Sequence, residues 1–83
     1  LGYEVGEVQL DRGNVLVQYT DGIVEALNQA EEQFGVQRLI DVVWGNYDCS
    51  SEEIVNKLFD EVELFSKSQV DDMTVVVVKA VDN

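Results

Sequence analysis

Apolar and polar residues alternate over the first part of the chain in the pattern of two β-strands. Residues 3–10 follow this alternation, except that Gly6 shifts its phase, so we expect a strand with a bulge or an interruption at Gly6. The four turn-forming residues 11–14 lead into a second β-rich run, residues 15–20. Two strands joined by so short a loop are predicted to form an antiparallel hairpin.

After Thr20 the spacing of apolar residues changes from two towards 3.6, the period of an amphipathic helix. This spacing predicts a short helix over residues 22–29 and a second helix within residues 34–46. Gly45 and Asn46 are suitable residues for the end of the second helix. Four aromatic side chains are interpreted as core residues: Phe34, Trp44, Tyr47 and Phe65.

The most regular helical pattern runs from about Ser51 to about Ser66. Ser50 and Glu53 have the spacing of a capping box, in which each side chain accepts a hydrogen bond from the other's backbone amide. Apolar residues recur on one face of this helix, which is typical of a helix that packs on a core. These residues are Ile54, Leu58, Val62 and Phe65.

The segment from Met73 to Val81 is the most strongly predicted strand, because four consecutive valines lie within it. An unbroken apolar run indicates a central strand that is buried on both faces. The resulting order is β-β-α-α-α-β. It predicts an α+β fold with helices packed on a mainly antiparallel sheet.

Composition narrows the functional classes. The 83 residues suffice for one small domain, or for part of one, and a hydrophobic content of 46% is ample for a core. A net charge of −12 argues against binding to nucleic acid and to anionic membranes. The single cysteine, Cys49, forms no internal disulfide, which suits the cytoplasm, and the absence of histidine excludes a histidine base or ligand. No apolar run has the length of a membrane span.

Two acidic positions lie where strands are predicted to meet loops. Asp21 follows residues 15–20, and the pair Asp71 and Asp72 precedes the closing strand. Carboxylates held at strand ends suit Mg²⁺ or Mn²⁺, which prefer oxygen ligands, provided that the two strands are neighbours in the sheet. The alternative is that Asp21 with Gly22 forms a turn or helix cap and that the Asp pair is a charged flank. The pattern alone favours this alternative.

Four motifs in order change this assessment: "RGNVLVQYTDGIVEALN", "FGVQRL", "SSEEIVNKL" and "DDMTVVVVK". Together they resemble the C-terminal half of the PPM-type (protein phosphatase 2C-like) metal-dependent serine/threonine phosphatases. The likeness is greatest to the bacterial branch that includes stage II sporulation protein E and the stress sigma-factor regulator phosphatases. It extends over nearly the whole chain, so we expect residues 1–83 to be the C-terminal fragment of one such domain and half of its α-β-β-α sandwich.

The resemblance implies a catalytic centre with two Mn²⁺ or Mg²⁺ ions per complete domain. By position, Asp21 and Asp71 match metal-binding aspartates of the family. Asp72 stands where many relatives have asparagine and is expected to be an accessory acid, and Gly22 is expected to allow a tight turn beside the ion. Asn14 replaces the aspartate that relatives usually have after the glycine, which we expect to alter only the turn.

Other features of the family are missing from this chain. The glycine-rich motif of the N-terminal half, with its bridging aspartate and its histidine, is absent, so we expect the fragment alone to bind metal weakly and to be inactive. The implied substrate is a phosphorylated regulatory protein, such as an anti-sigma factor antagonist, in the bacterial cytoplasm. A half-sandwich with an exposed sheet is also expected to dimerise. The alternative functions are a non-catalytic, pseudophosphatase-like regulatory module and an acidic protein-binding domain with an accidental resemblance.

Overall fold

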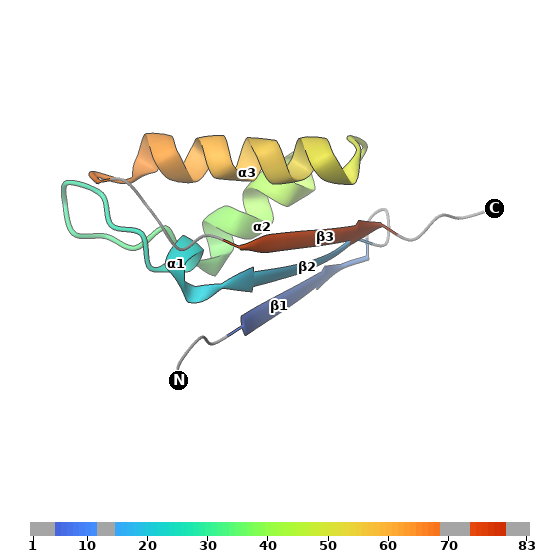
Figure 1. The fold of residues 1–83 in the computed structure, drawn as a ribbon, viewed down its shortest axis with the longest axis horizontal. Helices are drawn as coiled ribbons and strands as arrows, with labels where there is room; N and C mark the ends of the chain where they lie inside the picture. Colours follow the sequence, from blue (N-terminus) through green and yellow to red (C-terminus); the bar gives the residue numbers. More distant parts are fainter. Residues whose placement is uncertain (1–4, 12–14, 69–73, 80–83) are drawn as a thin grey trace.

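The computed structural model describes residues 5–11, 15–68 and 74–79, which form a sheet with helices packed against one of its faces (Figure 1). The order of elements is the predicted β-β-α-α-α-β, and the α+β fold is confirmed. The elements are β1 (Val5–Leu10), β2 (Val15–Thr20), α1 (Asp21–Val24), α2 (Gly35–Gly45), α3 (Ser51–Phe65) and β3 (Val75–Lys79).

The described strands form a three-stranded antiparallel sheet in the order β1-β2-β3. Leu10 pairs with Val15, which confirms the predicted hairpin. The predicted central position of the last strand is wrong within the described sheet, because β2 occupies the centre and β3 pairs with β2 alone. The helices cover one face only, so Val76 and Val78 on the other face are 47% and 51% exposed.

Strand β1 is continuous, so the bulge predicted at Gly6 is also wrong. The β1–β2 ladder runs without interruption from Val5 opposite Thr20 to Leu10 opposite Val15. Gly6 lies opposite Tyr19, and a β-carbon added to Gly6 would collide with the Tyr19 ring. The glycine therefore makes room for an aromatic ring on the neighbouring strand instead of interrupting the pairing.

Helix α1 is shorter than predicted and ends at Val24 instead of near Gln29. The reason lies in Asn28, whose side-chain oxygen accepts hydrogen bonds from the backbone amides of Ala30 and Glu32, both at 2.9 Å. Such side-chain bonds stabilise a turn in place of further helix. In addition, the Phe34 amide donates a hydrogen bond to the Ala26 carbonyl at 2.8 Å, which joins the two ends of the loop between α1 and α2.

Helices α2 and α3 agree closely with their predicted ranges. Helix α2 ends at Gly45 with Asn46 as its C-cap, as predicted. At the start of α3, the Glu53 amide donates to Ser50 Oγ and the Ser50 amide donates to Glu53 Oε1, both at 3.1 Å. The predicted capping box is thereby confirmed. Within the described ranges, none of the helices combines the length and the apolar character needed to cross a bilayer.

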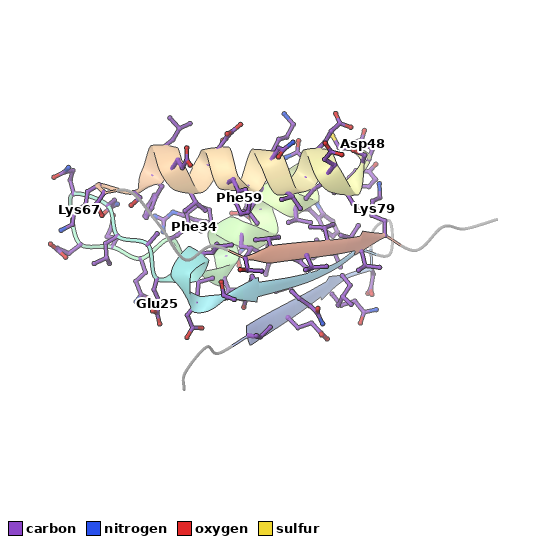
Figure 2. All side chains as sticks on the ribbon, in the orientation of Figure 1. Glu25, Phe34, Asp48, Phe59, Lys67 and Lys79 are labelled. Carbon is purple, nitrogen blue, oxygen red and sulfur yellow. The ribbon has the colours of Figure 1, made fainter. Side chains whose placement is uncertain are left out.

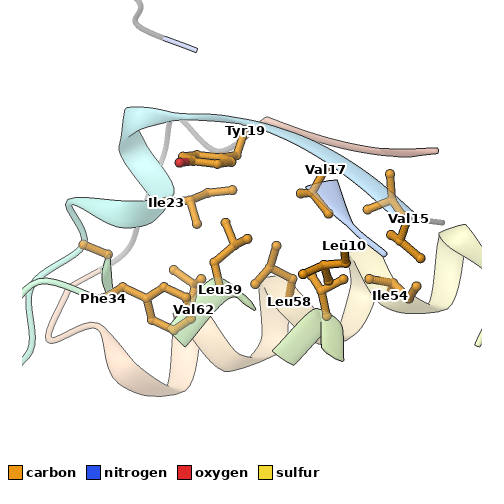
Figure 3. Packing of buried hydrophobic residues seen from close by; sticks show 13 residues of the cluster. Leu10, Val15, Val17, Tyr19, Ile23, Phe34, Leu39, Ile54, Leu58 and Val62 are labelled. Atoms are coloured by element: carbon orange, nitrogen blue, oxygen red, sulfur yellow. The ribbon is translucent and has the colours of Figure 1, made fainter. Parts of the chain in front are cut away.

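The core lies between the sheet and the two longer helices (Figure 3). Three of the four residues on the predicted apolar face of α3 are buried, and Phe65 packs edge-to-face on the buried Phe34 with ring centroids 5.4 Å apart. Trp44 is 43% exposed, so its predicted core position is wrong. The buried residues are Leu10, Val15, Val17, Tyr19, Ile23, Ala26, Phe34, Leu39, Val43, Ile54, Leu58, Val62 and Val77.

A lysine joins the end of β3 to the segment that precedes α3. The Nζ atom of Lys79, which is labelled in Figure 2, donates a hydrogen bond to the Cys49 carbonyl oxygen at 2.6 Å. The aliphatic part of a lysine side chain can cover apolar surface while its ammonium group reaches a polar partner. Lys79 thus fixes one end of β3 to the helical layer.

Candidate metal site

Strands β2 and β3 are neighbours, which is the arrangement that a shared metal site requires. Because they are antiparallel, the end of β2 and the beginning of β3 lie at the same edge of the sheet. The Thr20 amide donates to the Thr74 carbonyl at 3.1 Å, and the Thr74 amide donates to Thr20 Oγ1, also at 3.1 Å. Asp21 therefore directly follows Thr20, which is hydrogen-bonded to Thr74, the residue that precedes β3.

Asp21 begins helix α1 and is half-buried. Its backbone carbonyl accepts a hydrogen bond from the Glu25 amide at 2.9 Å, which fixes the main chain at this position. Among residues 5–11, 15–68 and 74–79, no hydrogen bond or ion pair engages its carboxylate. The carboxylate thus has the donor atoms that Mg²⁺ or Mn²⁺ prefers and no competing partner in the described part of the chain.

The structure describes only one of the other three predicted site residues, Gly22. Gly22 is the second residue of α1 and does not adopt a positive φ, so its expected part in a tight turn beside an ion stays a prediction. Asp71 and Asp72 lie outside the described residues. Within those residues, no group of three or more acidic or cysteine side chains is placed to hold a metal ion. The described structure therefore supplies one candidate ligand, Asp21.

Two residues that the sequence analysis did not single out are central to this edge of the sheet. Thr20 and Thr74 tie β2 to the beginning of β3, and they contribute to the lining of a hollow of about 200 Å³ at this edge. A partial signal was present in the sequence, because a threonine at the junction of a predicted strand and a predicted helix is a candidate N-cap residue. The actual partner of its side chain lies 54 positions away in the sequence and has no local signature.

The loop that follows α1 is anchored to the segment after α3. The Lys67 amide donates to the Leu27 carbonyl at 2.8 Å, and the Lys67 ammonium group forms an ion pair with Glu31. Both side chains of the ion pair are solvent-exposed, so its contribution to stability is expected to be small. The backbone bond is the firmer link between these two segments.

Comparisons with known proteins agree with the motifs. The family described as stage II sporulation protein E matches residues 1–81. A relative, protein IcfG of Synechocystis sp. (strain ATCC 27184 / PCC 6803 / Kazusa), is 30% identical over 78 residues, which amount to 92% of this chain. The chain spans only 12% of the length of that relative. No solved structure matches the chain.

The match of the family along almost the whole sequence decides the classification, and the order of strands and helices is compatible with it. The chain belongs to the stage II sporulation protein E family, which is a family of protein phosphatase 2C-like phosphatases.

Proposed function

We propose that residues 1–83 form the C-terminal part of a PPM-type domain that hydrolyses phosphoserine or phosphothreonine on a regulatory protein. The observation that carries the proposal is the pairing of Thr20 with Thr74. It brings Thr20, the second residue of the "YTDG" motif, beside Thr74, the last residue of "DDMT". In a phosphatase of this type the acids of these two motifs must reach the same ions, and that requirement needs neighbouring strands.

Asp21 and Asp71 are the proposed metal ligands, with Gly22 and Asp72 in supporting roles. Two Mn²⁺ or Mg²⁺ ions in the complete domain would supply an activated water and neutralise charge on the phosphoryl group. The role of this chain is to hold its carboxylates in place before the ions bind. Asp21 is suited to that role, because the sheet on one side and the first turn of α1 on the other fix its backbone.

The remaining ligands are proposed to come from other parts of a longer protein. The open face of the sheet supports this view, because it presents Val5, Val76 and Val78, which are 65%, 47% and 51% exposed. Apolar side chains on a sheet face are usually covered by another layer. A second sheet of an α-β-β-α sandwich would cover them and would carry the missing part of the metal centre.

The proposed substrate is a phosphorylated protein, with an anti-sigma factor antagonist as the example suggested by the resemblance. The proposed location is the bacterial cytoplasm. The net charge of −12 supports a protein substrate over nucleic acid, because binding to a phosphate backbone requires clustered lysine and arginine residues.

The test is hydrolysis of a phosphoserine protein by the full-length protein with and without added Mn²⁺. Asp21→Asn is expected to reduce Mn²⁺-dependent turnover by about a hundredfold or more, since even indirect partners of a metal ligand are worth about 10–100-fold. Glu25→Gln is the matched control, because Glu25 is exposed and lies four residues further along the chain. Turnover that needs no metal, or that survives Asp21→Asn, would contradict the proposal. A folded full-length protein that binds the phosphoprotein without hydrolysing it would support the pseudophosphatase alternative.

A further inference from the structure

The hydroxyl group of Thr20 has an unusual partner. Thr20 is the N-cap residue of α1, with φ −97° and ψ 162°. A threonine at this position ordinarily accepts a hydrogen bond from a backbone amide in the first turn of its own helix. Thr20 makes no such side-chain bond to α1. Its Oγ1 atom instead accepts a hydrogen bond from the amide of Thr74, at 3.1 Å.

This bond completes a pair that the backbone makes only in part. In a hydrogen-bonded antiparallel pair, two opposite residues exchange two bonds between amides and carbonyls. Here the Thr20 amide donates to the Thr74 carbonyl, but the returning bond from the Thr74 amide ends on the Thr20 hydroxyl. The chain enters α1 at the next residue, so a side chain supplies the second acceptor and extends the pairing beyond Tyr19 and Val75.

We propose that Thr20 is a positioning residue for the metal centre. Its hydroxyl fixes the beginning of β3 relative to Asp21, and it does so at the cost of a cap on a helix of four residues. The inference rests on the proposed function, in which acids on both sides of this contact bind the same ions. A hydrogen-bond acceptor is required at residue 20: serine supplies it, whereas valine has nearly the same shape as threonine and lacks it.

The test is a calorimetric titration of the full-length protein with MnCl₂ alone, without substrate. Thr20→Val is expected to weaken Mn²⁺ binding by about 10–100-fold, the range found for groups that orient metal ligands. Thr20→Ser is expected to bind Mn²⁺ nearly as well as the unaltered protein. In amide hydrogen exchange, the Thr74 amide should exchange faster in Thr20→Val than in Thr20→Ser. If Thr20→Val does not fold, Thr20→Ala provides the comparison with Thr20→Ser.

Ser50→Ala is the control for a general loss of stability, because it removes the cap of α3 and leaves residues 20 and 74 unchanged. It is expected to lower the melting temperature while Mn²⁺ affinity stays unchanged. Equal Mn²⁺ affinity for Thr20→Val and Thr20→Ser would overturn the role of Thr20. Asp21→Asn separates the two proposals. If Asp21→Asn also leaves the affinity unchanged, the proposed function fails; if it weakens binding while Thr20→Val does not, only the role of Thr20 fails.

Discussion

The ring of Tyr19 on β2 occupies the space above Gly6, its partner on β1. Tyr19 is buried, and Gly6 belongs to the inward-facing series of β1 together with Val8 and Leu10. An aromatic ring that covers a glycine on the adjacent strand compensates for the packing that the glycine lacks. The pair therefore explains why glycine occurs in the middle of a continuous strand.

Gly6→Ala is expected to lower the free energy of unfolding by about 1–3 kcal/mol, the usual cost of inserting an extra carbon into a packed core. This cost exceeds the roughly 0.5–1 kcal/mol that alanine normally gains over glycine in a regular element. Gly45→Ala is the matched control, since a β-carbon there has no atom within 4 Å. It should be neutral or stabilising. Urea unfolding of both variants measures the difference, and a stabilising Gly6→Ala would contradict the packing argument.

The cap of α3 predicts a specific dependence of stability on pH. The Ser50 amide, which donates a hydrogen bond to the Glu53 carboxylate, is the main cause that lowers the pKa of Glu53 below its ordinary value of 4.5, and the Ser50 hydroxyl group is the second. Because the folded-state pKa is the lower one, the ionised carboxylate stabilises the fold above pH 4.5. That contribution is lost as the pH falls through the folded-state pKa.

Glu53→Gln tests this dependence, because glutamine keeps an acceptor for the capping box and does not titrate. The difference in melting temperature between the unaltered protein and Glu53→Gln should be constant above pH 4.5 and should shift against the unaltered protein below it. Glu52→Gln is the control, since Glu52 is exposed in the same first turn and takes no part in the capping box. A constant difference across the acid range would show that Glu53 has the same pKa in both states.

Local signals in the sequence predicted local structure well. The capping box of Ser50 and Glu53, the end of α2 at Gly45 and the hairpin between β1 and β2 all depend on residues close in the chain. Each of these features was predicted correctly. The assignment of Asp21 as a metal ligand rests on its motif and stays a prediction. The structure adds that β2, which ends directly before Asp21, pairs with β3, which begins directly after Thr74.

Non-local features were predicted less well, for a physical reason. Four consecutive valines in a sequence do not indicate whether a second layer covers the outer face of the strand. In β3, Val76 and Val78 on the outer face are exposed. Gly6 resembled a bulge because the Tyr19 ring that covers it comes from another strand. The bond between Thr20 and Thr74 joins residues 54 positions apart, and no periodic pattern records such a contact.

The 83-residue chain alone is expected to bind Mn²⁺ weakly and to show no appreciable phosphatase activity. The reason is the number of ligands, because this chain offers Asp21 and Asp71 as proposed ligands, whereas a centre for two ions needs several more carboxylates. Incubation of the isolated chain with a phosphoserine peptide and excess Mn²⁺ measures this directly. Clear turnover by the isolated chain would show that it contains a complete centre and would contradict the division of the site.

The isolated chain is also expected to self-associate through the open face of the sheet. Val76 and Val78 are about half exposed on this face, and β3 is an edge strand of the described sheet. Apolar faces and unpaired strand edges favour association, because burial removes apolar surface from water and pairs free backbone groups. Light scattering at increasing protein concentration should therefore show a rise in molar mass towards that of a dimer.

Replacing both valines with lysine distinguishes association through the open face of the sheet from association through other surfaces. Val76→Lys with Val78→Lys should shift the chain to the monomer, because charged side chains resist burial in an apolar interface. Leu64→Lys is the matched control: Leu64 is 83% exposed on α3, in the helical layer, and its replacement should leave association unchanged. Loss of association in the Leu64 variant alone would assign the contact to the helices. A monomeric unaltered chain at high concentration would indicate that the exposed valines do not drive association, and it would remove one argument for a missing second layer.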